Sequence, residues 1–352
     1  MRPASHTVCA EAFEWNNKRK FTVIYNFLYI SSMEAIHTVY TRSARTAAEF
    51  ILRDEVVAFP TETVYGLGAN VFSEAALKKI FAAKGRPADN PLIVHVSTFG
   101  QIGLLTGTIT PAAQTIIDNF FPGPVTVIVP KRKTISPLVS AGLPTIGIRM
   151  PRHEAAQAFL TACGVPVAAP SANISGRPSP TSWQSVRDDL DGRIGCVLQG
   201  RKTDVGLEST VVDCTGRHPV VLRSGAVTLE EMQAVLPTTT VYSKNTTGPA
   251  KSPGMKYRHY SPHARVIVTS ALTMPVVTPG EASAYIGLHT PMHVRLYSPV
   301  QLCADLHEYA RTVFSFFRQC DKKRVAAIYC EQVSDEGIGR ALMDRIHRAA
   351  HH

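Results

Sequence analysis

The sequence has no apolar run long enough to cross a membrane. A membrane-spanning helix needs about 20 consecutive apolar residues, whereas the longest candidate, residues 21–30, is shorter and carries Thr22 and Asn26. We therefore expect no membrane-spanning helix and no membrane partner.

Several familiar active-site motifs are also absent. The sequence has no G-x-x-x-x-G-K-[ST] phosphate loop, no H-E-x-x-H metal motif and no G-x-S-x-G nucleophile elbow, and no G-x-G-x-x-G follows the first predicted strand. A bound nucleotide would therefore be held by scattered side chains rather than by one phosphate loop. Covalent hydrolysis has no candidate nucleophile with a neighbouring base.

Cysteine is present, but not in a pattern that indicates cross-linking. The seven cysteines are odd in number, widely spaced and never arranged as C-x-x-C, which argues against a disulfide scaffold and against a structural zinc site. This usage fits a reducing compartment, and we expect a cytoplasmic protein.

The overall composition is typical of a folded protein. The 352 residues are 45% hydrophobic and 18% charged, which is enough to bury a full core, and the length allows two domains. Lys and Arg number 37 against 27 Asp and Glu, giving a net charge of +10. This excess suits anionic partners such as nucleotides, phosphates or RNA, and charge alone does not choose among them.

The chain divides into four segments by sequence pattern. Residues 1–32 have no amphipathic period, and we expect a disordered or non-native extension, with translation starting at Met33. Residues 40–236 alternate helical and strand patterns, and residues 237–263 have the Pro-, Gly-, Ser- and Thr-rich composition of a linker. Residues 264–352 alternate again and predict a second, smaller domain.

Both alternating segments are predicted to be α/β. The first contains short strands that sometimes follow one another without a helix, which favours a mixed sheet; they cover residues 56–59, 92–96, 125–129, 145–149, 165–169, 196–198, 210–213 and 220–223. In the second we expect strands over 264–269, 283–288, 294–297 and 325–329, and helices near 301–318 and 337–350.

Two segments place polar side chains directly after apolar stretches. In residues 59–68, Thr61 and Thr63 follow a strand and can offer hydroxyls to a ligand; the alternative is an ST-turn with Gly66 and Gly68 as turn glycines. In residues 84–92, a helix runs into Lys84 and Arg86, with Asn90 and two prolines close behind.

The pair Lys84 and Arg86 is suited to a triphosphate, because lysine gives a point charge and arginine a bidentate fork. Interaction with the helix dipole would account for Lys84 but not for Arg86 and Asn90. His95 follows within an apolar strand, where a histidine is by itself more often a core residue than a ligand.

Two further segments point to the same kind of site. Arg149 ends an apolar strand, where a lone charge is costly, so it needs a carboxylate or phosphate partner, either from a ligand or in a structural salt bridge. Ser171 and Asn173 follow the strand at 165–169 and face the same way if that strand continues. Segments 208–210 and 221–226 carry weaker signals of the same type.

Taken in order, PTETVYGLGAN, KGRPADNPL, GIRMP, APSAN, ESTVVD and VLRSGA resemble the YrdC/Sua5 family of threonylcarbamoyl-AMP synthases over residues 40–236. SPGMKYRHYSP resembles the linker of the longer Sua5 type, and residues 264–352 are similar to its C-terminal domain. The resemblance implies a twisted mixed sheet with flanking helices, followed by a Rossmann-like α/β domain, with the linker of residues 237–263 closing over the site as a lid.

The resemblance also implies an activity, in which L-threonine, bicarbonate and ATP give L-threonylcarbamoyl-AMP and pyrophosphate. The product is the activated intermediate for N6-threonylcarbamoyladenosine (t6A) at position 37 of tRNA. The implied catalytic residues are Lys84, Arg86, Ser171 and Asn173. The implied threonine-binding residues are Thr63, His95, Arg149, Ala169 and Ser209. The implied ATP-binding residues are Arg86, Asn90, Thr145, Ser171, Ser179, Arg223 and Tyr260.

The same resemblance implies Mg²⁺ bound mainly through ATP, no protein metal site, a downstream threonylcarbamoyl transferase as partner, and tRNA only indirectly. Two alternatives remain open at this point. One is a non-catalytic module that binds tRNA or double-stranded RNA; against it, the clusters 131–133 and 322–324 are short and lack interleaved aromatics. The other is the related carbamoyl-adenylate chemistry of hydrogenase maturation, which the absence of acylphosphatase-like and zinc-finger segments disfavours.

Overall fold

The computed structural model describes residues 36–242, 260–270 and 280–350. The extension expected at residues 1–32, the start expected at Met33 and residues 243–259 of the predicted linker lie outside the described residues. Residues 38–352 cluster as one compact unit. Within the part that is described, no helix combines the length and the apolarity needed to cross a bilayer.

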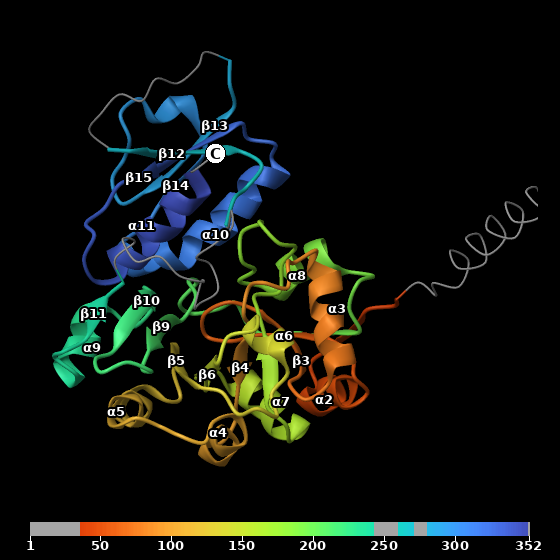
Figure 1. Cartoon of the computed structure of the whole chain (residues 1–352). Coiled ribbons are helices and arrows are strands. Elements are labelled where there is room, and N and C mark those ends of the chain that lie inside the picture. Colours follow the sequence, from red (N-terminus) through yellow and green to blue (C-terminus); the bar gives the residue numbers. More distant parts are fainter. Residues whose placement is uncertain (1–35, 243–259, 271–279, 351–352) are drawn as a thin grey trace, which may run out of the picture. The chain divides into compact units, whose positions relative to one another are not determined.

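A large mixed sheet dominates the first part of the chain (Figure 1). Among the described residues it has 11 strands in the order β1-β8-β2-β3-β7-β4-β6-β5-β9-β10-β11. In chain order these are β1 (Val39–Thr41), β2 (Val57–Phe59), β3 (Gly66–Asn70), β4 (Ile93–His95), β5 (Val125–Pro130), β6 (Thr145–Arg149), β7 (Val167–Ala169), β8 (Cys196–Leu198), β9 (Thr210–Asp213), β10 (Val220–Arg223) and β11 (Thr240–Val241).

Parallel and antiparallel pairs alternate irregularly across this sheet. β2 is parallel to β8 and antiparallel to β3, and β7 is antiparallel to both β3 and β4. β6 is parallel to β4 and antiparallel to β5, which is in turn parallel to β9. The predicted mixed α/β sheet is therefore confirmed.

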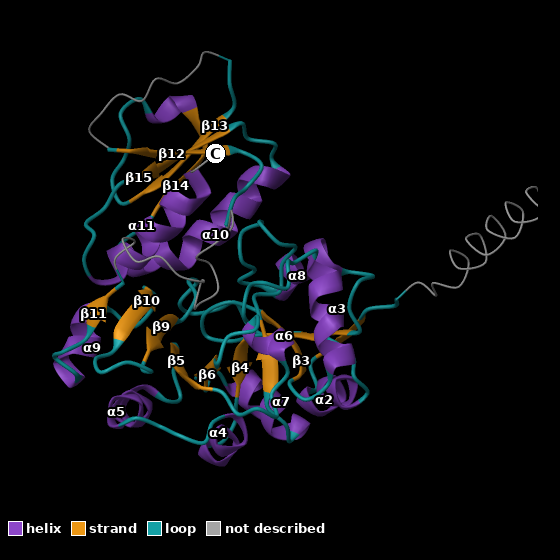
Figure 2. Ribbon diagram, in the orientation of Figure 1, coloured by secondary structure: helices purple, strands orange, loops and turns teal. Residues whose placement is uncertain are grey.

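Helices flank the sheet (Figure 2). They are α2 (Ala44–Leu52), α3 (Glu74–Lys84), α4 (Phe99–Leu105), α5 (Pro111–Phe120), α6 (Pro137–Ser140), α7 (Glu154–Cys163), α8 (Trp183–Leu190) and α9 (Leu229–Val235). Successive residues of a strand face opposite sides, so Phe59 packs in a core with α2 and α7, whereas Ala58 belongs to a larger core with α3 and α5.

Local sequence fixes the helix that leads into the site. The Ser73 side chain accepts a hydrogen bond from the Ala76 N–H and begins α3. Gly85, at φ +60°, ends it in the left-handed conformation that glycine adopts at little cost. Lys84 therefore stays on the helix, while Arg86 leaves it in a new direction.

The C-terminal part has its own sheet. Within the described residues its strands lie in the order β12-β15-β13-β14 and all pairs are parallel, which confirms the predicted second α/β fold. The strands are β12 (Arg265–Thr269), β13 (Ser283–Gly287), β14 (Tyr297–Leu302) and β15 (Ala327–Glu331), and the helices are α10 (Leu306–Lys322) and α11 (Gly337–Ala350). Figure 1 shows α10 and α11 side by side along this sheet.

Two predictions for this part are wrong in detail. Val294–Leu296 form a 3₁₀ turn, preceded by His293 at φ +54°, and the strand predicted there begins only at Tyr297. The apolar residues of the turn are exposed, so their pattern does not report a buried strand face. α10 begins later than predicted, because the Asp305 side chain accepts from the Glu308 N–H and caps the helix there.

The core of the C-terminal part includes two residues of the first part. Val64 and Leu207 of the first part belong to the same buried cluster as Phe314 of α10 and Leu342 of α11. Two loops that follow strands of the large sheet are thus packed against the helices of the C-terminal part.

Candidate active site

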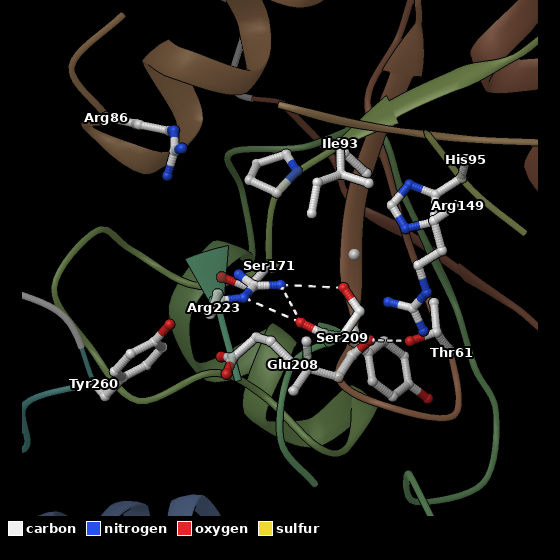
Figure 3. A pocket seen from close by; sticks show the side chains of 15 residues that line it. Thr61, Arg86, Ile93, His95, Arg149, Ser171, Glu208, Ser209, Arg223 and Tyr260 are labelled. Carbon is white, nitrogen blue, oxygen red and sulfur yellow. Dashed lines mark hydrogen bonds between the residues drawn. The ribbon is translucent and has the colours of Figure 1, made fainter. Parts of the chain in front are cut away.

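One pocket gathers the loops at the ends of several strands of the large sheet (Figure 3). Carboxyl ends of strands are where open α/β sheets bind ligands. Among the described residues the pocket is lined by Thr61, Val64, Tyr65, Gly66, Arg86, Ile93, His95, Arg149, Ala169, Pro170, Ser171, Glu208, Ser209, Arg223 and Tyr260. In the view of Figure 3, His95, Arg149 and Thr61 lie to one side, and Arg86 and Tyr260 to the other.

Arg149 at the end of β6 has the carboxylate partner that its position demands. Its Nη2 atom lies 2.9 Å from Oε2 of Glu62, and both side chains are buried. The ion pair lacks a well-aligned hydrogen bond, and Nε of Arg149 has no hydrogen-bond partner among the described residues. The structural salt bridge thus exists, and Arg149 still has a donor available for a ligand.

His95 is a neutral side chain. It is 4% exposed and packs edge-on against Phe59, with ring centroids 5.6 Å apart. Burial, and then the nearby Arg149 charge, lowers the pKa of His95 from 6.5 to about 3. Its Nδ1 atom makes no hydrogen bond with the described residues, so it can accept or donate one to a ligand.

Thr61 and Thr63 form the turn that was one of the two alternatives for this segment. The Thr61 hydroxyl accepts from the Thr63 N–H at 3.2 Å and donates to the Val64 carbonyl at 2.7 Å. The hydroxyls of Thr61 and Thr63 are 2.9 Å apart. Thr61 lines the pocket, and Thr63 lies behind it.

Lys84 holds the loop that carries Ser171 and Asn173. Its Nζ donates to the Ser171 carbonyl at 2.6 Å and to the Asn173 carbonyl. Burial, and then Arg86, lowers the pKa of Lys84 well below its usual range. The Ser171 hydroxyl donates to Oδ1 of Asn173 at 2.5 Å, so the two side chains meet although β7 has already ended at Ala169.

Arg86 presents its guanidinium from the loop after α3. It donates to the carbonyls of Asn90 at 3.2 Å and Pro91 at 3.1 Å. Burial lowers the pKa of Arg86 to about 10, against the charge effects of Tyr260 and Asp89. Arg86 therefore remains a cation at neutral pH, and its Nε has no hydrogen-bond partner among the described residues.

Arg223 and Ser209 form the middle of the pocket. Nε and Nη2 of Arg223 donate to the Ser209 carbonyl at 3.1 and 2.9 Å, and Nη2 also reaches the Ser209 hydroxyl at 3.1 Å. The hydroxyls of Thr126 and Ser209 are 2.8 Å apart. Ser209 is thereby fixed from two sides.

The structure brings many of the predicted site residues together. Those that line the pocket are Arg86, His95, Arg149, Ala169, Ser171, Ser209, Arg223 and Tyr260. Lys84, Asn173, Thr63, Asn90 and Ser179 stand one layer behind it, bonded to or adjoining lining residues. Thr145 lines a second, smaller cavity that shares Ile93 with the pocket.

Sequence reasoning did not single out the two glutamates of the site. Glu62 pairs with Arg149, and Glu208 accepts a hydrogen bond from the Ser179 hydroxyl at 2.6 Å. Both lie inside the segments that carried the resemblance, and each is an acidic residue directly beside a buried strand or turn. A buried acid of this kind needs a cation, which is the signal that would have identified them.

Comparisons with known proteins assign both parts of the chain to one family. Residues 49–225 match a family model of the Sua5, YciO and YrdC proteins described as "Telomere recombination", and residues 227–351 match the threonylcarbamoyl-AMP synthase C-terminal domain. These two matches define a YrdC-type catalytic fold joined to a Sua5-type second domain.

Relatives of full length carry both parts. The chain is 42% identical to the threonylcarbamoyl-AMP synthase of Pyrococcus abyssi, over 87% of this chain and 93% of the relative. It is also 42% identical to that of Bacillus subtilis, over 86% and 92% of the two chains. A crystal structure of P. abyssi Sua5 complexed with L-threonine superposes with a TM-score of 0.80 at 39% identity, covering 90% of this chain and 98% of that one.

The chain therefore belongs to the threonylcarbamoyl-AMP synthase family, in its two-domain Sua5 form. The family, the function and the nucleotidyltransferase class predicted from the sequence are confirmed.

Proposed function

We propose that this threonylcarbamoyl-AMP synthase uses L-threonine, bicarbonate and ATP, and that it releases pyrophosphate as it forms the activated intermediate for t6A at position 37 of tRNA. The observation that carries the proposal is a single pocket with Arg149 beside neutral His95 in one region and Arg86 and Arg223 in another. A carboxylate and a phosphate chain can each find an arginine there.

The proposed chemistry needs charge neutralisation and alignment more than a side-chain base. The threonine amine attacks the carbon of bicarbonate, and loss of water leaves a carbamate. A carbamate oxygen then attacks the α-phosphorus of ATP, the bond from that phosphorus to the bridging oxygen breaks, and pyrophosphate leaves. Cations and hydroxyls fixed by the fold stabilise the charge that gathers on the phosphates.

Threonine fits the end of the pocket at Arg149. The proposed contacts are a salt bridge from Arg149 to the substrate carboxylate and hydrogen bonds from His95 and Ser209. Thr63, one layer behind Thr61, fixes that hydroxyl through their 2.9 Å contact. The relative crystallised with L-threonine supports the choice of amino acid.

ATP fits the end that holds Arg86, Ser171, Arg223 and Tyr260. Asn90 and Ser179 are proposed to act nearby, and Thr145 from the adjoining cavity that shares Ile93. Lys84 and Asn173 fix the Ser171 loop. For Lys84 we therefore propose a positioning role. Contact with the triphosphate, for which the sequence suggested this side chain, would require its Nζ to leave two carbonyls.

The residues at the pocket do not fit a protein-held Mg²⁺. Mg²⁺ prefers several oxygen ligands, whereas Glu62 and Glu208 are each paired with an arginine. Among the described residues no group of three or more His, Cys, Asp or Glu side chains could hold a metal ion. We propose that Mg²⁺ enters as the complex with ATP.

Several sequence predictions stay predictions. They include the segment boundaries at residues 40–236, 237–263 and 264–352 and the cytoplasmic location. The product is a mixed anhydride that water destroys, so we propose that a downstream threonylcarbamoyl transferase consumes it and that tRNA is reached through that enzyme.

Pyrophosphate release tests the function. Purified protein with ATP, Mg²⁺ and bicarbonate should release pyrophosphate only when L-threonine is added. Arg149→Met should raise the KM for threonine by at least about tenfold, because it removes a charge-assisted contact of roughly 1.5–3 kcal/mol. Arg53→Met is the matched control, since Arg53 is exposed and its guanidinium contacts Glu49 and Phe50, neither of which lines the pocket.

Two results would overturn the proposal. Release that does not depend on threonine would point to another acceptor. Absence of release, together with salt-dependent RNA binding, would favour the non-catalytic RNA-binding module.

A further inference from the structure

An arginine of the C-terminal helix α11 reaches the wall of the pocket. Arg345 is 0% exposed. Its Nε donates to Oε2 of Glu208 at 2.9 Å, and its Nη2 donates to the Ser224 carbonyl at 2.8 Å. Glu208 lines the pocket, so only one side chain separates the C-terminal part from the ligand space there.

Arg345 also touches the pocket residue Tyr260. Its guanidinium carbon lies 5.5 Å from the centroid of the Tyr260 ring, within the range of a cation–π contact. The same ring stacks on Phe314 of α10 at 5.3 Å. Two residues of the C-terminal part therefore contact the Tyr260 ring.

The backbone of Tyr260 shows how firmly it is placed. Its φ of +65° is the left-handed conformation, which costs a residue with a Cβ about 1–2 kcal/mol. The next residue, Ser261, donates its N–H to the Gly176 carbonyl at 2.9 Å. Packing against Arg345 and Phe314 offsets this cost.

The negative charge on Glu208 depends on its ion pair with Arg345. Burial alone would raise the pKa of Glu208, but Arg345, Arg223 and the Ser179 hydrogen bond together lower it. Glu208 is therefore an anion that fixes the Ser179 hydroxyl at 2.6 Å. Without Arg345, Arg223 would be the remaining cation that lowers the pKa of Glu208, and the proposed mechanism needs Arg223 for ATP.

Other ion pairs join the two parts without reaching the pocket. Arg340, also on α11, pairs with Glu230 of α9 at 3.4 Å. Lys322 of α10 pairs with Asp188 of α8 at 2.6 Å. Neither pair touches a pocket-lining residue. A buried ion pair gives little net stability, so adhesion of the two parts does not by itself explain why Arg345 is charged.

We propose that Arg345 is a positioning residue of the C-terminal domain. It holds Glu208 and Tyr260 in place and so fixes the arrangement of side chains at the ATP end of the pocket. The proposal rests on the proposed function and assigns the second domain a part in it. Threonine recognition around Arg149 and His95 does not pass through Arg345 in this arrangement.

The test compares three variants in the full chain. Arg345→Met keeps much of the side-chain volume and removes the charge; Arg345→Lys keeps the charge; Arg340→Met is the matched control from the same helix. Threonine-dependent pyrophosphate release gives kcat and the KM for ATP, and calorimetric titration with L-threonine gives its Kd.

We expect Arg345→Met to lower kcat/KM for ATP by about 10- to 100-fold while the threonine Kd changes less than about twofold. Arg345→Lys should recover most of the loss, and Arg340→Met should match the wild type. Adding Glu208→Gln to Arg345→Met should lower kcat/KM for ATP only slightly further, because the two residues act as one unit.

Three results would overturn the inference: wild-type kcat/KM for ATP in Arg345→Met, an equal loss in Arg340→Met, or an equal loss of threonine binding. If Arg345→Met does not fold, Arg345→Lys with and without Glu208→Gln decides. The inference expects Glu208→Gln to lower kcat/KM for ATP in that background, and wild-type kcat/KM for ATP in both variants would overturn it. A wild-type protein without threonine-dependent release would refute the proposed function instead.

Discussion

Stability should fall as the pH drops from about 7.5 to about 5.5, and His95 should account for a defined share of that loss. Burial, and then Arg149, lowers its pKa from 6.5 to about 3 in the folded protein. In this pH window the unfolded chain therefore binds a proton at His95 that the folded chain does not. Proton binding to the unfolded state favours unfolding, so this contribution to stability is present above pH 6.5 and is lost as the pH falls.

The size of the effect follows from the two pKa values. With 6.5 unfolded and about 3 folded, protonation of the unfolded ring costs about 1.4 kcal/mol of stability at pH 5.5, and less than about 0.1 kcal/mol at pH 7.5. The buried carboxyl groups of Asp189 and Glu208 and the half-buried carboxyl group of Asp344 have lowered pKa values. They release their stabilisation mainly below this window.

Urea unfolding at the two pH values measures the effect. For His95→Gln, the free energy of unfolding should fall between the two pH values by about 1.4 kcal/mol less than for the wild type. Val94→Ala is the matched control, because Val94 is a fully buried neighbour in β4 and the variant keeps His95. It should be less stable at both pH values and show the wild-type loss. An equal loss in His95→Gln would refute the neutral, buried state of this ring.

Two further predictions concern the frame of the site. Gly225→Ala should destabilise the protein by about 2 kcal/mol or more in urea, because an added Cβ would meet backbone atoms 2.3–2.5 Å away, whereas at Gly216 the nearest atom is 3.8 Å away. Equal stability of the two alanine variants would contradict this. Lys84→Met should lower the free energy of unfolding by about 2 kcal/mol and also lower kcat, because it leaves the Ser171 carbonyl without its donor. Lys79 is half-exposed, so Lys79→Met should lower the free energy of unfolding by less than about 0.5 kcal/mol. A similar loss for both lysines would contradict the buried role of Lys84.

The strands that the sequence predicted well each contain β-branched residues, and β8 and β9 are buried along their whole length. β6, β8, β9 and β10 lie where the pattern placed them. β3 has the sequence GLGAN, and the turn interpretation of Gly66 and Gly68 is wrong. Neighbouring strands explain the glycines, since a Cβ at Gly68 would lie 2.6 Å from Cγ1 of Val167. That constraint comes from a strand far away in sequence, so local pattern cannot show it.

The site shows the same division between local and long-range information. The demand that Arg149 have an anionic partner followed from its apolar strand, and the structure supplies Glu62. The sequence could not show where the Lys84 side chain points, because its partners are main-chain carbonyls of the Ser171 loop rather than side chains. Residue type indicated the charges of the site, and only the fold indicated which charges face the ligand.

The two buried glutamates explain how several arginines can line one pocket. Arg86, Arg149 and Arg223 would repel one another and lose hydration if nothing opposed them. Glu62 offsets Arg149 at one end, and Glu208 lies beside Arg223 at the other.

The glutamates offset only part of the positive charge of these arginines. Three arginines and Glu208 line the pocket among the described residues, and His95 adds no charge. The pocket therefore keeps an excess of positive charge, which suits the carbamate and the phosphate chain that we propose as its ligands. Arg345 satisfies Glu208 from the C-terminal side, which leaves Arg223 to the ligand. In the role that we propose for Arg345, the second domain contributes to the reaction by balancing the charge of Glu208, although Arg345 does not itself line the pocket.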